Sequence, residues 1–336
     1  MKFFAILLIL CQVAALYPED LVGVAPLDSK AEALWRQGSD SLEAGRYEAA
    51  IAAFESALKI SPEYHDALFS LGVASRRGGD HARAVLAFQE LLRITPQLVD
   101  AWYQMGLSYA SQGQYGKASD AYRMALSYND ECGVCHCALS LASRERGSKG
   151  ECFSEAKTCT GLLPQYGGAW NLLGIAEMDK GNVDGASRAF RSAVGLSPNY
   201  ANAWHNLGSA LRGMNKLEDS ESAYWTACSL APDADNYNAL GELRLRRKNY
   251  KAAGEAFEAA LKKEPDAAEP HWGLARAWRK LGKAGLARLE ESRYRRAVGS
   301  ARGDEDYVSE PSESFKKADL QANIEAWGDS HAERTR

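Results

Sequence analysis

The chain has 336 residues, of which 46% are hydrophobic and 25% are charged, and its formal net charge is −4. This composition is typical of an ordinary globular protein, and the small acidic excess argues against a basic surface for nucleic acid. We therefore expect a folded protein that has no nucleic-acid partner.

The first 15 residues predict a secretory signal peptide. Lys2 provides a positive start, residues 3–10 are all apolar, and a Val-Ala-Ala sequence offers small residues for cleavage after Ala15. The apolar run is short for a membrane-spanning helix, so an N-terminal anchor is the lesser alternative, as is a lipid on Cys11. We expect an exported protein, located in the periplasm or cell envelope or secreted.

Residues 16–30 form a polar lead, in which Asp28 or Ser29 can cap the first helix. After this lead, one pattern of two helices and a turn fills residues 31–301. It recurs at steps of 34 residues, with a single step of 33, which gives eight repeats. Internal repetition of this period is typical of stacked helical hairpins.

Five features recur in the pattern. The first helix has a small residue at Gly38, Gly72, Gly106, Ser140, Gly174, Gly208, Gly241 and Ala275. The second helix has a small residue at Ala50, Ala84, Ala118, Cys152, Ala186, Ser220, Ala253 and Ala287. Four residues later stand Phe54, Phe88, Tyr122, Ala156, Phe190, Tyr224, Phe257 and Glu291. Prolines end most of the second helices, and the turns contain Gly45, Gly79, Gly113, Gly147, Gly181, Asn215 and Gly282. The turn glycines predict left-handed helix ends.

This spacing resembles the tetratricopeptide repeat (TPR) family, whose pattern is W-x2-L-G-x2-Y, then A-x3-F, then P. The resemblance covers about four-fifths of the chain. It implies an all-α protein, a right-handed α-solenoid of about eight helix-turn-helix repeats stacked on one continuous core. Repeat four (residues 133–166) departs most from the pattern, and repeat eight departs as a terminal repeat does.

Residues 302–336 follow the last repeat. They begin with an acidic linker and continue with a short amphipathic helix over 315–327, on which Leu320, Ile324 and Trp327 share one face. This helix either docks on the solenoid or is a weak helix in a disordered tail.

Five of the six cysteines beyond the signal peptide lie in or beside repeat four, at Cys132, Cys135, Cys137, Cys152 and Cys159. An exported protein meets oxidising conditions, which favour disulfides. The start of the first helix and the end of the second are adjacent in a hairpin. We therefore expect a bridge from Cys132 or Cys135 to Cys159, although sequence alone leaves the connectivity open.

The run from Cys132 to His136 reads C-x-x-C-H, which resembles the attachment site of c-type haem. That resemblance implies thioethers at Cys132 and Cys135 and His136 as an axial iron ligand. Against it, His136 occupies a position where other repeats have large packing residues. The same three residues suit zinc, and the two cysteines suit thiol–disulfide exchange. We expect no resident cofactor, with haem c as the alternative.

Motifs of catalysis are missing from the sequence, which has no phosphate loop, G-x-G-x-x-G, H-E-x-x-H or G-x-S-x-G. We expect a non-enzymatic scaffold or adaptor that binds a peptide or helix of another protein. The alternative is a c-type haem or thiol redox protein that uses Cys132, Cys135 and His136.

The family resemblance implies a concave groove lined by the second, fifth, ninth and twelfth residues of each repeat. The predicted binding residues are Trp35, Phe69, Val73, Arg76, Tyr103, Leu107, Leu141, Arg144, Asn171, His205 and Arg212. Apolar residues dominate the first five repeats, so we expect an apolar or amphipathic segment there. Its carboxylates would pair with the three arginines. Alternatively, tighter coiling or the chain's own tail buries this stripe.

Overall fold

The computed structural model describes residues 28–301, and sixteen α-helices account for all the regular structure in that range. The predicted signal peptide, most of the lead, the acidic linker and the helix at 315–327 lie outside the described residues. Asp28 caps the first described helix as expected, because its side chain accepts a hydrogen bond from the Lys30 amide at 2.8 Å. Within residues 28–301 no helix is both long and apolar enough to cross a bilayer.

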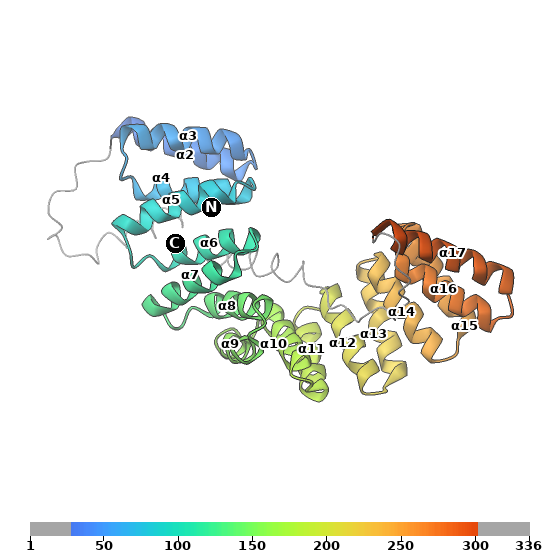
Figure 1. Ribbon diagram of the computed structural model, residues 1–336. Helices are drawn as coiled ribbons and strands as arrows, with labels where there is room; N and C mark the ends of the chain where they lie inside the picture. The colour runs from blue at the N-terminus through green and yellow to red at the C-terminus, as the bar shows by residue number, and fades with distance from the viewer. Residues whose placement is uncertain (1–27, 302–336) are drawn as a thin grey trace, which may run out of the picture. The chain divides into compact units, whose positions relative to one another are not determined.

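The chain divides into two compact units, Met1–Ile94 and Thr95–Arg336. The N-terminal unit contains repeats one and two. Its helices are α2 (Ser29–Glu43), α3 (Tyr47–Ile60), α4 (His65–Arg77) and α5 (His81–Ile94). Each repeat is an antiparallel hairpin, and α3 packs on α4 to join the two (Figure 1).

The C-terminal unit contains repeats three to eight, again as successive hairpins (Figure 1). Repeats three to five are built from α6 (Val99–Ser111), α7 (Tyr115–Tyr128), α8 (Gly133–Glu145), α9 (Lys149–Leu162), α10 (Gly167–Asp179) and α11 (Val183–Leu196). Repeats six to eight are built from α12 (Ala201–Gly213), α13 (Leu217–Leu230), α14 (Ala234–Arg246), α15 (Tyr250–Lys263), α16 (Ala268–Lys280) and α17 (Ala284–Ala301). The described chain is therefore an all-α solenoid of helical hairpins.

The turn inside every repeat contains one residue with a positive φ angle. Six of these residues are the predicted turn glycines, with φ between 69° and 86°. Asn215 (φ 61°) and Lys248 (φ 60°) take the same place in repeats six and seven. The prediction of left-handed helix ends is confirmed, and Lys248 is a strained exception because a side chain disfavours this conformation.

The glycine at the recurring small position of the first helix lies under the aromatic ring of its own repeat in six repeats. A Cβ atom added to Gly174 would stand 2.4 Å from Phe190 Cε1, and one added to Gly106 would stand 2.4 Å from the ring of Tyr122. Phe190 is fully buried. The glycine therefore makes room for the ring as well as for the second helix. Repeats four and eight have Ser140 and Ala275 instead of glycine, and both lack the aromatic residue.

Tryptophan side chains near the start of three hairpins bond back to the segment that precedes the hairpin. In repeats three, five and six the indole N–H of the fourth residue donates to the carbonyl of the proline six residues earlier. The pairs are Trp102–Pro96 at 2.7 Å, Trp170–Pro164 at 2.9 Å and Trp204–Pro198 at 2.8 Å. Each bond satisfies a backbone carbonyl just past the end of the preceding helix.

Candidate functional site

Most of the predicted groove residues are buried within the solenoid. They are at most 9% exposed, and they comprise Phe69, Val73, Arg76, Tyr103, Leu107, Leu141, Asn171 and His205. The ring of Phe69 meets Phe88 edge-on at 5.8 Å, and that of Tyr103 lies 6.0 Å from Tyr122. Both rings therefore pack against the second helix of their own repeat.

Leu107 and Leu141 line an apolar gap between α6, α7 and α8, but its volume is only about 10 Å³. That is room for about one water molecule. A peptide side chain does not fit there. Together with the burial of the stripe, this gap shows that apolar residues of the first helices mainly stabilise the stack.

Trp35, Arg144 and Arg212 are the predicted groove residues that stay partly exposed. Trp35 donates its indole N–H to Ser70 Oγ at 3.1 Å. Arg144 Nε lies 2.5 Å from Asp179 Oδ2 on α10, and its Nη2 lies 3.3 Å from Asp179 Oδ1. The sequence predicted that Arg144 would pair with a carboxylate of a partner protein. In the structure it pairs with Asp179 of the next repeat.

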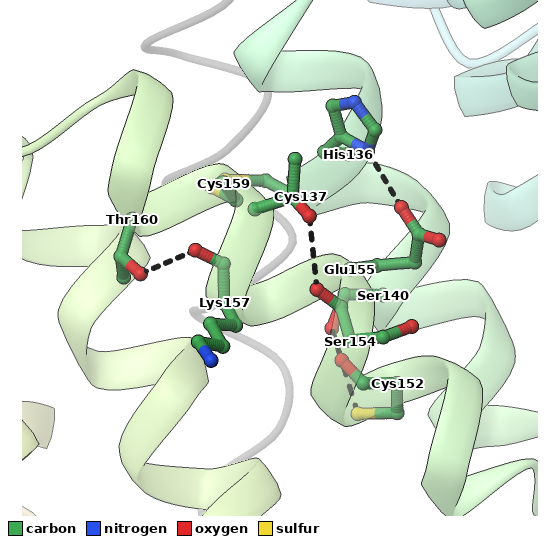
Figure 2. Close-up of a disulfide and its surroundings, with 10 residues drawn as sticks. His136, Cys137, Ser140, Cys152, Ser154, Glu155, Lys157, Cys159 and Thr160 are labelled. Carbon is green, nitrogen blue, oxygen red and sulfur yellow. Dashed lines mark hydrogen bonds and ion pairs between the residues drawn. A yellow bond between two sulfur atoms is a disulfide. The ribbon is translucent and has the colours of Figure 1, made fainter.

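Four cysteines lie in two pairs around repeat four. Cys132 and Cys135, here named the N-cap pair, have Cα atoms 5.3 Å apart. Cys137 and Cys159, here named the interhelix pair, have the same Cα separation and join α8 to α9 (Figure 2). Both separations are in the range of disulfides.

The pairing differs from the expected bridge between Cys159 and Cys132 or Cys135. The reason is the register of α8 against α9. Ser140 Oγ donates to the Cys152 carbonyl at 2.7 Å, and a Cβ on Gly133 would stand 2.6 Å from Leu163 Cγ. With these contacts at the two ends of the hairpin, Cys159 faces Cys137.

The ring of His136 is held at both nitrogens. Its Nδ1 lies 2.6 Å from Glu155 Oε2 (Figure 2). Its Nε2 lies 2.9 Å from the Asp130 carbonyl oxygen. The hydrogen bond to Glu155 raises the pKa of His136, and the carbonyl of Asp130 adds to this, while partial burial acts in the opposite direction. Both nitrogens of the protonated ring are donors.

This arrangement does not fit c-type haem or zinc. An axial or zinc-binding histidine needs a free nitrogen lone pair, and both nitrogens of His136 face acceptors of this chain. The sulfur atoms of Cys132 and Cys135 face one another. Among residues 28–301, no group of three or more His, Cys, Asp or Glu is arranged to hold a metal ion.

Repeat eight contains the same arrangement. His271 Nδ1 lies 2.6 Å from Glu290 Oε2, and its Nε2 lies 3.0 Å from the Pro265 carbonyl oxygen. His136 and His271 thus bond to the carbonyl that tryptophan reaches in repeats three, five and six. Sequence reasoning missed Glu155, although a signal was present. At its position the six repeats without this histidine have Ala53, Ala87, Ala121, Ala189, Ala223 and Ala256.

Comparison with solved structures shows the same fold. A tetratricopeptide repeat protein from Parabacteroides merdae is 17% identical, with a TM-score of 0.59 over 74% of this chain and 99% of its own. The APC/C hetero-tetramer Cut9-Hcn1 contains a chain that is 17% identical, with a TM-score of 0.57 over 83% of this chain and 52% of that chain. Pseudomonas aeruginosa pilF is 17% identical, with a TM-score of 0.54 over 59% of this chain and 90% of its own. No curated protein matches the sequence.

Family models give the decisive comparison. One model described as tetratricopeptide repeat matches residues 35–99, 171–235 and 238–302, and a second with the same description matches residues 99–132. The matched segments make up more than half of the chain, and the gap between them contains the divergent repeat four. The chain belongs to the tetratricopeptide repeat family.

Proposed function

We propose that this chain is an exported scaffold without catalytic activity, which binds a segment of another protein along the first helices of repeats four to six. Repeats of this family suit this role because stacked hairpins present an extended surface to which a partner can bind, and such binding requires no catalytic centre. The observation that carries the proposal is a row of three side chains at the twelfth position of consecutive repeats.

The row consists of Arg144 on α8, Met178 on α10 and Arg212 on α12, each partly exposed. Helix α10 packs against both α8 and α12, so the three positions are neighbours across the repeats. Met178 offers a flexible apolar contact, and Arg212 adds positive charge beside it. Arg144, which pairs with Asp179, and Arg212 place positive charge at the two ends of the row. We expect the partner segment to place an apolar side chain over Met178 and an acidic side chain beside the charged ends of the row.

A displayed peptide library, panned on the purified chain, tests this surface. Met178→Asp and Arg212→Glu alter the row. The control is Arg188→Glu, which reverses the charge of an arginine on the exposed face of α11, away from the row. We expect both row variants to weaken the selected peptides by about tenfold or more, and the α11 control to bind as the wild type does. Peptides that bind all four proteins equally would exclude this surface.

Export is the second part of the proposal. It rests on the signal-like residues 1–15 and on the two cysteine pairs, because disulfides persist in oxidising compartments. The test is the intact mass of the chain from a cell that exports it, before and after reduction. We expect loss of the first 15 residues and a gain of two hydrogen atoms for each disulfide. A retained N-terminus would contradict export, and a haem-sized adduct would contradict the assignment of Cys132 and Cys135 to one another.

A further inference from the structure

The N-cap pair lies at the start of a helix in an asymmetric environment. Cys132 is the N-cap residue of α8, and its side chain makes no capping hydrogen bond. It is partly exposed, whereas Cys135, within the first turn, is fully buried. Cys132 is thus the more accessible residue of the pair.

The charge at this helix end favours a thiolate on Cys132. Free backbone N–H groups and the helix dipole place partial positive charge at the N-terminus of α8, and the first turn of α8 contains no acidic residue. The adjoining His136 ring is paired with the Glu155 carboxylate, so the charges of the protonated ring and the carboxylate largely cancel and the helix start remains the main positive element. Asp130 and Glu131 act against this, but both are exposed and screened by solvent. Thiolates at helix N-termini are commonly stabilised in this way.

The interhelix pair provides an internal contrast. Cys137 and Cys159 are both fully buried between α8 and α9. Cys152 is also buried, and burial raises the pKa of its thiol. A dissolved thiol therefore reaches Cys132 while the hairpin stays folded, but reaches the interhelix pair only after the hairpin opens.

We propose that Cys132 and Cys135 form a redox-active pair that passes its disulfide to a dithiol of another protein. This activity goes beyond the scaffold function and does not depend on the row of Arg144, Met178 and Arg212. The substrate class is an accessible protein or peptide dithiol, which is oxidised once per chain.

The exchange proceeds in two displacements. A substrate thiolate attacks Cys132 Sγ, the bond between Cys132 and Cys135 breaks, and Cys135 leaves as a thiolate that takes a proton. The second substrate thiolate then attacks the substrate sulfur of the mixed disulfide, and Cys132 leaves as a thiolate stabilised by the start of α8. The substrate loses two electrons and gains a disulfide, and the pair gains two electrons and becomes two thiols. The two protons released by the substrate thiols balance those taken up by Cys132 and Cys135 or by solvent.

The first experiment uses the full chain in its oxidised form with reduced glutathione under native conditions. Samples are quenched in acid and alkylated, and the cysteines of each pair are quantified by peptide mass spectrometry. We expect the N-cap pair to be reduced about tenfold faster or more than the interhelix pair, because only Cys132 is accessible. Equal rates of reduction for the two pairs would overturn the proposal. Reduction of the N-cap pair only in denaturant would also overturn it.

A second experiment separates exchange from a merely structural disulfide. Cys135→Ser and Cys132→Ser are each reduced and then treated with oxidised glutathione. We expect Cys135→Ser to collect glutathione on Cys132 about tenfold faster or more than Cys132→Ser collects it on Cys135. Circular dichroism shows whether each variant is folded. If either is unfolded, the native reduction rates of the wild-type pairs decide the matter, and rates within a factor of about two would again refute the proposal.

Discussion

Glu155 Oε2 lies 2.6 Å from His136 Nδ1, and Glu290 lies at the same distance from His271 four repeats later. The six repeats without this histidine have alanine at the glutamate position. A tryptophan paired with alanine is thus replaced twice by a histidine paired with glutamate. Each ring still bonds to a carbonyl at the end of the preceding repeat, and its other nitrogen bonds to the glutamate.

The replacement predicts a strong coupling between the two positions. His136→Trp alone leaves Glu155 without its partner, and Glu155→Ala alone removes an acceptor of a partly buried ring, so each should lower the free energy of unfolding by about 1–2 kcal/mol. The double variant restores the pairing of repeats three, five and six. It should unfold within about 0.5 kcal/mol of the wild type in a urea titration. Additive losses would show that the two positions do not substitute as a unit.

The raised pKa of His136 predicts a pH dependence. Because the folded-state pKa lies above the unfolded value, the protonated ring binds its proton more tightly in the folded chain. Its contribution to stability is fully present below the unfolded pKa of about 6.5 and is lost as the pH rises through the folded pKa. Urea titrations at several pH values should show this loss in the wild type and a smaller one in Glu155→Gln. An equal pH dependence in both proteins would assign the effect to other groups.

The helical hairpins and their turns were predictable because their signals are local. A glycine or asparagine in a turn and a proline after a helix act within a few residues, and the observed φ angles follow them. The burial of Tyr103 and Leu107 depends instead on how successive hairpins stack. The partner of Cys159 depends on the register of α8 against α9, and a shift by two residues exchanges one cysteine for another. Such relations between distant residues leave little trace in one sequence, except where repeats can be compared, as at Glu155.

Replacing glycine by alanine should have opposite effects on stability at two positions, one under an aromatic ring and one facing open space. In Gly174→Ala the new Cβ would stand 2.4 Å from the ring of fully buried Phe190, so we expect a loss of about 1–3 kcal/mol. Gly195→Ala, on the exposed side of α11 with no atom near its added Cβ, should stabilise by about 0.5–1 kcal/mol through helix propensity. Denaturant unfolding measures both. A neutral Gly174→Ala would mean that the ring moves aside freely.

The positive φ of Lys248 predicts a stabilising substitution. Lys248→Gly removes the strain of a side chain in the left-handed conformation and should raise the free energy of unfolding by about 1 kcal/mol. Lys157→Gly, in the exposed middle of α9, should lower it by about the same amount, because glycine weakens a helix interior. Asn215→Gly should have a smaller effect than Lys248→Gly, since asparagine tolerates this conformation. Destabilisation by Lys248→Gly would indicate that the lysine side chain stabilises the turn in another way.

The ion pair between Arg144 and Asp179 predicts a measurable coupling between repeats four and five. Their side chains are 11% and 18% exposed and form two hydrogen bonds, so solvent screens them less than a surface pair. Asp179→Asn should lower the free energy of unfolding by about 1–2 kcal/mol, and the loss should shrink little in 0.5 M salt. The control is Glu32→Gln, which breaks the pair of Glu32 with Arg36, at 40% and 70% exposure, and should change stability by less than about 0.5 kcal/mol. If the two variants lose equally little free energy of unfolding, the ion pair with Asp179 stabilises the fold no more than hydration of Arg144 would. Its charge would then be available to a carboxylate of a bound partner, as the sequence first indicated.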